Sequence, residues 1–95
     1  MILQIIRLTS DLPEEELQKR AKDRAPNFKS ISGLLQKYYI KTSNEGEYGG
    51  VYIWDSLQSL QAYQQTDLAK SIPEAYAIKG VPDIEIMDII FQLRK

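Results

Sequence analysis

The stretch Ile2-Leu3-Gln4-Ile5-Ile6-Arg7-Leu8 carries the strongest signal for the fold, because apolar side chains occupy both its odd and its even positions. Successive residues of a β-strand point to opposite faces of a sheet. Residues 84–93 repeat the pattern: Met87 and Phe91 lie on one face, and isoleucines interrupted by Asp88 lie on the other. The chain therefore predicts a first and a last strand that are apolar on both faces.

Between these two strands, the pattern predicts two helices and a β-hairpin. The first helix is expected to have Ser10 or Asp11 as its cap, with Pro13 in its first turn. The expected elements, in chain order, are a strand at 2–8, a helix that Pro26 ends, strands at 31–42 and 51–54 joined by a turn at 44–47, a helix capped by Asp55 or Ser56, a short turn capped by Thr66 or Asp67, and a strand at 84–93.

This order matches the split β-α-β motif of ferredoxin-like domains. Right-handed crossovers then give an antiparallel sheet in the strand order 4-1-3-2, with both helices on one face. We therefore expect residues 1–95 to form a single α+β domain of the βαββαβ, ferredoxin-like kind.

Two helices can cover only one face of that sheet. An antiparallel sheet with its second face in water normally alternates apolar and polar side chains, and the first and last strands of the chain do not. A second copy of the chain is the simplest cover, because twofold dimers are the commonest assemblies. We therefore expect a homodimer; a monomer with an apolar face, or cover by a different protein, are the alternatives.

The amino-acid composition excludes several kinds of catalytic and binding site. The chain has no cysteine and no histidine, which excludes disulfides, thiolate sites and the commonest general base, metal ligand and haem ligand. Its net charge of −1 predicts no general attraction to nucleic acid or anionic lipid. The first residues do not form a signal peptide, and no stretch approaches the roughly 20 apolar residues that cross a membrane. We expect a cytoplasmic protein that binds no metal, no nucleic acid and no membrane.

Several motifs resemble one known family. They are Gly33-Leu34-Leu35-Gln36-Lys37-Tyr38-Tyr39, Gly46, Gly49-Gly50-Val51-Tyr52-Ile53-Trp54-Asp55-Ser56, Ala62-Tyr63 and Val81-Pro82-Asp83-Ile84-Glu85. Together they resemble the YdhR-like monooxygenases of the dimeric α+β barrel superfamily, which also contains the antibiotic-biosynthesis monooxygenases. The match covers about two thirds of the chain; the first strand and helix agree in placement rather than in motif.

The resemblance implies a homodimer whose two sheets pack into a barrel, with a pocket between sheet and helices in each subunit. Related oxygenases oxidise aromatic polyketides with O₂ and without a cofactor, and haem-degrading relatives bind haem in the same place. The chain has no histidine for haem, so we expect no cofactor.

Aromatic side chains are the candidates for the wall of such a pocket. Tyr52 and Trp54 lie two residues apart and share one face of a strand. Tyr38 lies on the neighbouring strand and Tyr63 on the following helix, whereas Tyr39 is expected to point the opposite way. Aromatic walls suit a small aromatic ligand. The alternative is that these residues belong to the core or to an interface.

Three charged residues are the candidates for catalysis. Arg7 and Asp88 interrupt apolar strands that should be antiparallel neighbours, so we expect them to meet, either as an arginine and a carboxylate base near the pocket or as a structural ion pair. Lys37 belongs to the family-like motif; its ammonium could stabilise a substrate oxyanion, or it could protect a sheet edge.

The leading interpretation is a cofactor-independent, monooxygenase-like protein that acts on a small aromatic or hydrophobic compound. One alternative is a non-catalytic dimer that binds a hydrophobic ligand. The other is an isomerase or decarboxylase of the same superfamily, in which a carboxylate, lysine or tyrosine would move protons.

Overall fold

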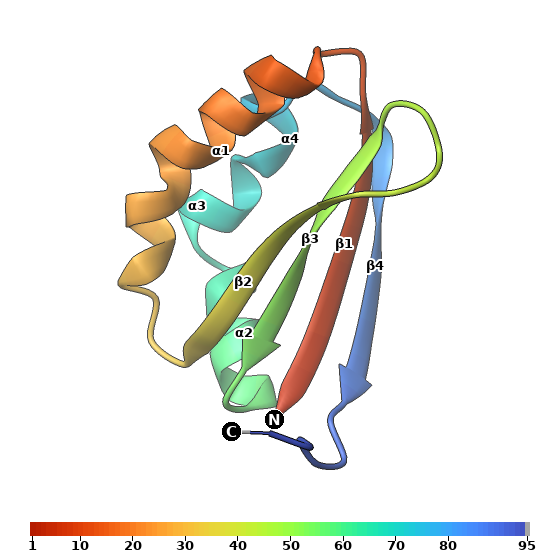
Figure 1. Ribbon diagram of the computed structural model, residues 1–95. Coiled ribbons are helices and arrows are strands. Elements are labelled where there is room, and N and C mark those ends of the chain that lie inside the picture. The colour runs from red at the N-terminus through yellow and green to blue at the C-terminus, as the bar shows by residue number, and fades with distance from the viewer. Residues whose placement is uncertain (95) are drawn as a thin grey trace.

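Four strands and four helices lie within residues 1–94, the part of the chain that the computed structural model describes (Figure 1). The elements, in chain order, are β1 (Ile2–Ser10), α1 (Glu14–Lys29), β2 (Leu34–Lys41), β3 (Glu47–Trp54), α2 (Leu57–Gln64), α3 (Asp67–Lys70), α4 (Ile72–Ala75) and β4 (Ile78–Asp88).

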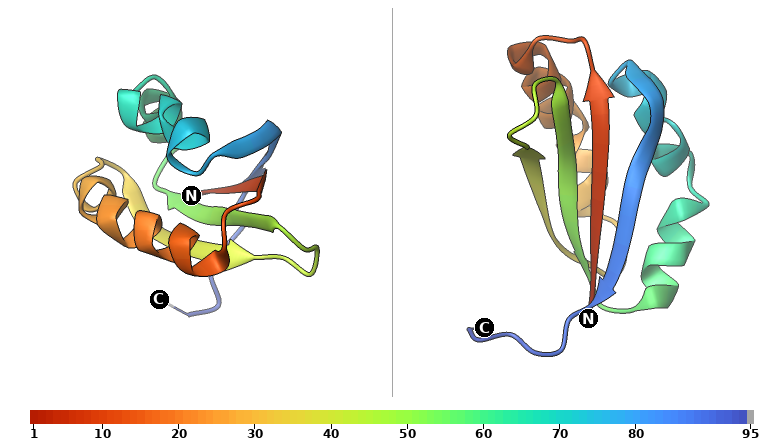
Figure 2. Two further views of the ribbon diagram at one scale, coloured as in Figure 1. Left: turned by 90° about the horizontal axis from the view of Figure 1, so that it is seen from above. Right: turned by 90° about the vertical axis from the view of Figure 1, so that its right-hand side faces the viewer.

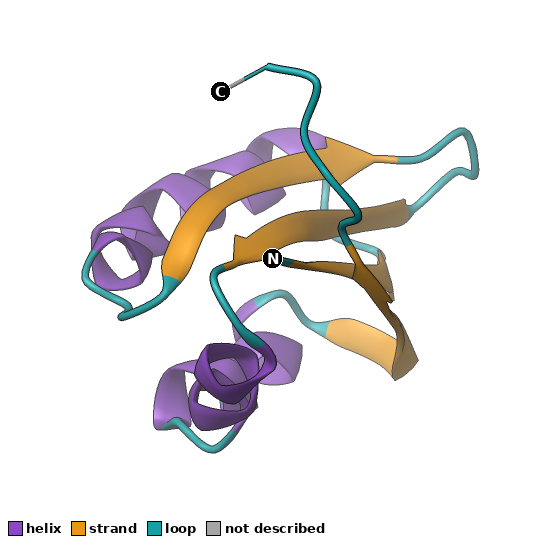
Figure 3. Cartoon of the chain, turned by 90° about the horizontal axis from the view of Figure 1, so that it is seen from below, coloured by secondary structure: helices purple, strands orange, loops and turns teal. Residues whose placement is uncertain are grey.

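The strands form an antiparallel sheet in the order β2-β3-β1-β4, which is the predicted order read from the other edge. The helices lie on the same side of this sheet, with α1 beside β2 and with α2 and α4 beside β3 and β4 (Figures 2 and 3). The predicted α+β ferredoxin-like fold is confirmed.

The last strand is shifted from its predicted place, because β4 begins at Ile78 and ends at Asp88. It begins early because residues 80–82 are accommodated in a bulge opposite β1. Pro82 lies in this bulge and has no backbone N–H. It is tolerated because β4 is an edge strand and residues in a bulge do not donate to the neighbouring strand. The strand ends at Asp88 because that residue pairs with Ile2, where β1 begins.

The first helix is longer than predicted, because Pro26 lies inside α1 and does not end it. A proline inside a helix loses one backbone hydrogen bond and disturbs the preceding turn. The final turn is held by Phe28, which is buried and packs against Tyr63 with a ring-centroid distance of 6.2 Å. Burial of a large aromatic side chain offsets the cost of the proline.

The predicted helix caps are confirmed for the later helices and wrong for α1. Ser56 caps α2 and Thr66 caps α3, each by accepting a backbone N–H with its hydroxyl oxygen. Pro13 occupies the cap position of α1 and makes no side-chain bond there. The hydroxyl of Ser10 instead donates to the carbonyl of Tyr76 at 2.7 Å, which ties the end of β1 to α4.

The core lies between the sheet and the helices and contains one buried polar pair. Trp54 and Leu60 are 0% exposed, and Gln4 is 1% exposed. The indole N–H of Trp54 donates to the side-chain oxygen of Gln4, so both buried polar groups are satisfied. This packing fixes β3 between β1 and α2.

The opposite face of the sheet has no helix over it (Figure 2). Leu3 and Ile5 of β1 and Val51 and Ile53 of β3 alternate with the helix-facing residues and are only half-buried. We call this side the open face. It is apolar on β1 at Leu3 and Ile5, as the sequence predicted, and also on β3. The predicted second apolar face of the last strand is wrong, because β4 ends at Asp88 and places Asp83 and Glu85 beside Met87 on this side. Within residues 1–94, no helix is long and apolar enough to cross a bilayer.

Candidate functional site

A cavity of about 250 Å³ lies between α1 and the sheet, over β2 and β3. Its wall combines aliphatic side chains from β1 and α1 with the tyrosines Tyr39, Tyr48, Tyr52 and Tyr76. An apolar cavity of this size with a few polar groups is the usual form of a site for a small ligand.

Gly50 makes room for this cavity. It lies directly opposite Tyr39 of β2, so it faces the helices, and it has no side chain to fill the space. A Cβ atom at Gly50 would lie 3.0 Å from Cε1 of Tyr52 and 3.5 Å from Cε of Lys37. The neighbouring Gly49 has a different role, because a Cβ there would overlap the backbone of β1.

The amine of Lys37 lies on the wall of the cavity. Its Nζ atom is 3.4 Å from the ring centre of Phe28, 4.4 Å from that of Tyr39 and 4.7 Å from that of Tyr52. A ring face favours an ammonium by about 0.5–2 kcal/mol. None of the ion pairs formed within residues 1–94 involves Lys37. Aromatic rings, and not a carboxylate, therefore surround this amine.

Burial, and then the nearby guanidinium of Arg24, lower the pKa of Lys37 to about 7. Arg24 is held in place by hydrogen bonds to the carbonyl of Leu68 and the hydroxyl of Ser71. At neutral pH, an amine with this pKa is present in both its charged and its neutral form. The charged form can hold an anionic oxygen, and the neutral form can accept a proton.

Tyrosine hydroxyls are further polar groups of the cavity. Burial raises the pKa of Tyr39 and of Tyr76, and it raises the pKa of Tyr52 well above its usual range. These hydroxyls are therefore neutral hydrogen-bond donors at physiological pH. The hydroxyl of Tyr76 is buried within the protein, and the guanidinium carbon of Arg24 lies 5.7 Å from the centre of the Tyr76 ring.

Glu14 and Lys41 form an ion pair at the rim of the cavity. The Nζ atom of Lys41 lies 2.9 Å from Oε1 of Glu14, which joins the start of α1 to the end of β2. This hydrogen bond raises the pKa of Lys41. Because both side chains are exposed, the pair contributes little to stability and opens at little cost.

Two of the predicted site residues, Tyr52 and Lys37, line the cavity. Trp54 and Tyr63 lie behind Tyr52 in the core: the Trp54 ring is 6.1 Å from the Tyr52 ring and 5.2 Å from the Tyr63 ring. Tyr38 points to the open face and is 55% exposed. The structure therefore does not bring Trp54, Tyr63 or Tyr38 to the cavity wall.

The expectation that Tyr39 points away from Tyr52 is wrong, and the reason is the hairpin register. The turn at residues 43–46 is closed by a hydrogen bond from the N–H of Thr42 to the carbonyl of Glu47. Its four residues place odd-numbered residues of β2 opposite even-numbered residues of β3. Residues directly opposite each other share a face, so Tyr39 faces the helices together with Tyr52.

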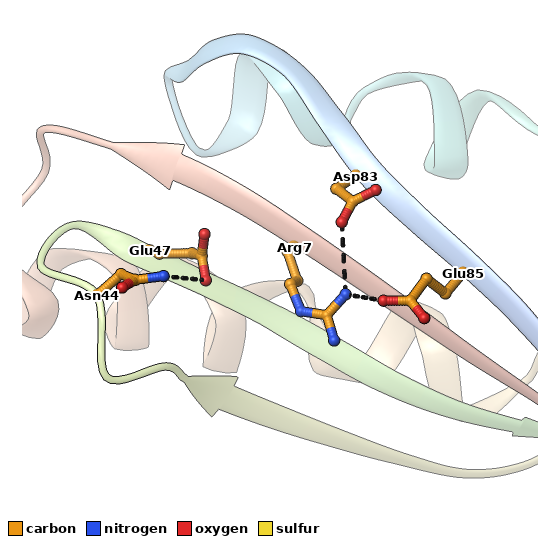
Figure 4. A network of polar contacts seen from close by, with 5 residues as sticks. All are labelled: Arg7, Asn44, Glu47, Asp83 and Glu85. Atoms are coloured by element: carbon orange, nitrogen blue, oxygen red, sulfur yellow. Dashed lines mark hydrogen bonds and ion pairs between the residues drawn. The ribbon is translucent and has the colours of Figure 1, made fainter.

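Arg7 and Asp88 do not form the predicted pair. Arg7 is opposite Asp83 in the ladder between β1 and β4, whereas Asp88 is opposite Ile2 at the far end. Arg7 instead forms ion pairs with Asp83 and Glu85 (Figure 4). Neither Arg7 nor Asp88 lines the cavity, so a catalytic role for either one has no support from their position.

The sequence analysis did not select several residues that line the cavity, among them Glu14, Tyr39, Lys41 and Tyr48. Strand alternation was the available signal, because a helix-facing Lys37 implies that the residues two and four positions later face the helices as well. Within residues 1–94, no group of acidic side chains is arranged to hold a metal ion.

An antiparallel βαββαβ sheet with its helices on one side, and an apolar cavity beneath the first helix, define a ferredoxin-like domain with a pocket for a small ligand. The family model described as "Putative mono-oxygenase ydhR" matches residues 2–93, and the chain belongs to that family. The resemblance that the sequence motifs indicated is thereby confirmed.

Solved structures share this fold at low sequence identity. A protein of unknown function from Nitrosomonas europaea is 17% identical with a TM-score of 0.80, covering 96% of this chain and 90% of that one. A putative antibiotic biosynthesis monooxygenase from Caulobacter crescentus is 23% identical with a TM-score of 0.74, covering 95% and 91%. SnoaB, a cofactor-independent oxygenase from Streptomyces nogalater, is 10% identical with a TM-score of 0.76, covering 99% and 97%. No curated protein sequence matches the chain.

Proposed function

We propose that the protein is a cofactor-independent monooxygenase that acts on a small aromatic or otherwise hydrophobic compound inside the cavity beneath α1. The observation that carries this proposal is the position of Lys37, whose amine lies on an apolar cavity wall among aromatic rings. Membership of the YdhR family and the shared fold with a cofactor-independent oxygenase support it.

The cavity suits a substrate that becomes an anion, such as a phenol or an enol. Neutral Lys37 accepts a proton from the substrate, and the resulting anion passes one electron to O₂. Recombination of the two radicals, with return of one proton, forms a hydroperoxide. The peroxide then loses water, so that a CH₂ group and O₂ become a C=O group and H₂O. The ammonium of Lys37 holds the anionic oxygen, and a tyrosine hydroxyl on the cavity wall donates a hydrogen bond to it.

The test is oxygen uptake with a panel of hydroxylated aromatic compounds, anthrones and naphthols among them. We expect uptake matched by product, and a loss of about tenfold or more in Lys37→Met, because the variant lacks the charge beside the substrate anion. Lys22→Met, at an exposed position of α1, is the matched control. A compound that raises the melting temperature without oxygen uptake would contradict the proposal and favour a binding module. Conversion without oxygen would favour an isomerase or decarboxylase.

We also propose that two copies pair through the open face. The apolar residues of β1 and β3 on this face lie in one patch, and Ile90, Phe91 and Leu93 after β4 are exposed as well. Covering such a patch contributes roughly 25 cal/mol per Å² before the costs of association. A second copy meets the patch with the same apolar surface.

A further inference from the structure

We propose that Lys37 also acts as a nucleophile, which condenses with the carbonyl group of an apolar aldehyde or ketone and holds it in the cavity as an imine. The inference shares its cavity with the proposed function, but it requires neither oxygen nor an acidic substrate.

The surroundings of Lys37 differ from those of the other lysines on the strands. Lys41 lies 2.9 Å from a carboxylate oxygen of Glu14, and Lys79 lies 2.7 Å from one of Asp11. Lys37 forms no ion pair within residues 1–94, and the ring of Phe28 is 3.4 Å from its nitrogen. A lysine that served only as a surface charge would be hydrated or paired with a carboxylate.

Burial and the guanidinium of Arg24 favour the neutral, nucleophilic form of the amine. Burial and the charge of Arg24 act in the same direction on Lys37, and both are known ways to activate a lysine as a nucleophile. The other charged or titratable groups of the cavity are Tyr39 and Lys41 of β2, Tyr48 and Tyr52 of β3, Tyr76 after α4 and Glu14 of α1. Glu14 is the one carboxylate that lines the cavity within residues 1–94, and it is already paired with Lys41.

The step balances without an oxidant or a reductant. The nitrogen lone pair of Lys37 attacks the carbonyl carbon and forms a carbinolamine, and loss of the hydroxyl oxygen as water leaves a C=N bond. The net reaction converts an amine and a carbonyl compound to an imine and water. The rings that surround the ammonium also stabilise a protonated imine. Tyr39, whose ring centre is 4.4 Å from the Lys37 nitrogen, supplies a hydroxyl donor on the same wall.

The test traps the imine with a reductant. The full-length protein is incubated without oxygen at about pH 7.5 with benzaldehyde and sodium cyanoborohydride, and peptide mapping by mass spectrometry locates the benzyl groups. We expect Lys37 to be labelled on the order of tenfold faster than any exposed lysine, because far more of it is neutral at this pH. Equal labelling of Lys37 and Lys22, or no label on Lys37, would overturn the inference.

Two further readouts separate a cavity reaction from random labelling. Lys37→Arg keeps the charge but cannot form an imine, so residue 37 should carry no benzyl group in this variant. In Lys22→Arg, Lys37 should be labelled as in the wild type. In the unmodified protein, benzyl alcohol in excess should slow labelling of Lys37 and leave Lys22 unchanged, which needs no variant to fold. If benzyl alcohol does not slow the labelling of Lys37, the imine does not form inside the cavity. Oxygen uptake without labelling contradicts the imine alone, and labelling without oxygen uptake contradicts the monooxygenase alone.

Discussion

The indole nitrogen of Trp54 donates a 3.0 Å hydrogen bond to the side-chain oxygen of Gln4, and both side chains are almost completely buried. The bond joins β3 to β1 beneath the helices. Its effect reaches the cavity, because the Trp54 ring stacks on the Tyr52 ring with an interplanar angle of 2°. Trp54 therefore supports a residue of the cavity wall without lining the cavity itself.

Replacing Gln4 by leucine tests this support. The change keeps much of the side-chain volume but leaves the indole N–H of Trp54 buried without an acceptor. We expect the free energy of unfolding to fall by about 1–3 kcal/mol, measured by urea denaturation. Gln61→Leu, at an exposed position of α2, should change it by less than about 0.5 kcal/mol. Equal effects of the two changes would show that the buried bond contributes nothing specific.

The low pKa of Lys37 predicts a pH dependence of stability. Between about 7 and its ordinary value of 10.5, Lys37 binds fewer protons in the native protein than in the unfolded chain. The free energy of unfolding of the wild type, relative to that of Lys37→Met, should therefore rise with pH across this window. The slope is at most about 1.4 kcal/mol per pH unit, and below the window the difference should be constant.

Urea denaturation of the wild type and of Lys37→Met at several pH values checks this dependence. The difference between the two proteins removes the titrations that they share. A difference that stays flat between about pH 7 and pH 10 would mean that Lys37 keeps an ordinary pKa in the native protein. Lys22→Met, which removes a lysine from an exposed position of α1, serves as the control.

Filling the cavity from the sheet side tests whether ligands use it. Gly50→Val places its side chain next to Tyr52 and Lys37, and Gly50 is not among the glycines with a positive φ, so valine meets no backbone strain there. We expect the rise in melting temperature caused by 1-naphthol to be lost, with a stability change of about 1–3 kcal/mol from overpacking. Val81→Ala, at an exposed position of β4, should keep the shift. An unchanged shift in Gly50→Val would place the ligand elsewhere.

Strand order and the apolar open face could be predicted from the sequence, because both follow from local patterns. Apolar residues at both the odd and the even positions of 2–8 identify a strand with two apolar faces. The βαββαβ order is compatible with few topologies that have right-handed crossovers. The family resemblance was also available, because its motifs are contiguous in the chain. These properties depend on short stretches of sequence. The strand order, the family and the apolar open face of β1 are confirmed, whereas β4 places Asp83 and Glu85 on that face.

The composition of the cavity wall could not be predicted, because it depends on register. The four-residue turn at 43–46 decides whether Tyr38 or Tyr39 shares a face with Tyr52, and a shift of one residue exchanges the two. The bulge at residues 80–82 likewise decides which carboxylate Arg7 meets. Turn lengths and bulges depend on how the whole chain packs, so the local residue pattern of a single sequence does not determine them.

The open face is the surface through which two copies of the chain are proposed to pair. Ile5 lies on this face at the centre of β1, opposite Val51 of β3, and it is half-buried. In a dimer that packs sheet on sheet, Ile5→Lys would bury one lysine from each copy in the apolar interface, where a charge is costly even beside Glu85 of β4. We expect the dissociation constant of the dimer to rise by on the order of 100-fold, which corresponds to about 3 kcal/mol.

Sedimentation velocity over a range of concentrations measures this constant, and circular dichroism checks that the variant is folded. Gln61→Lys adds the same charge to an exposed position of α2 and should leave the dimer intact. If the wild type sediments as a single chain at every concentration, the pairing is wrong. If Ile5→Lys stays dimeric, the two copies meet through another surface, and the open face is then free for a different partner, since a patch of this kind rarely stays exposed.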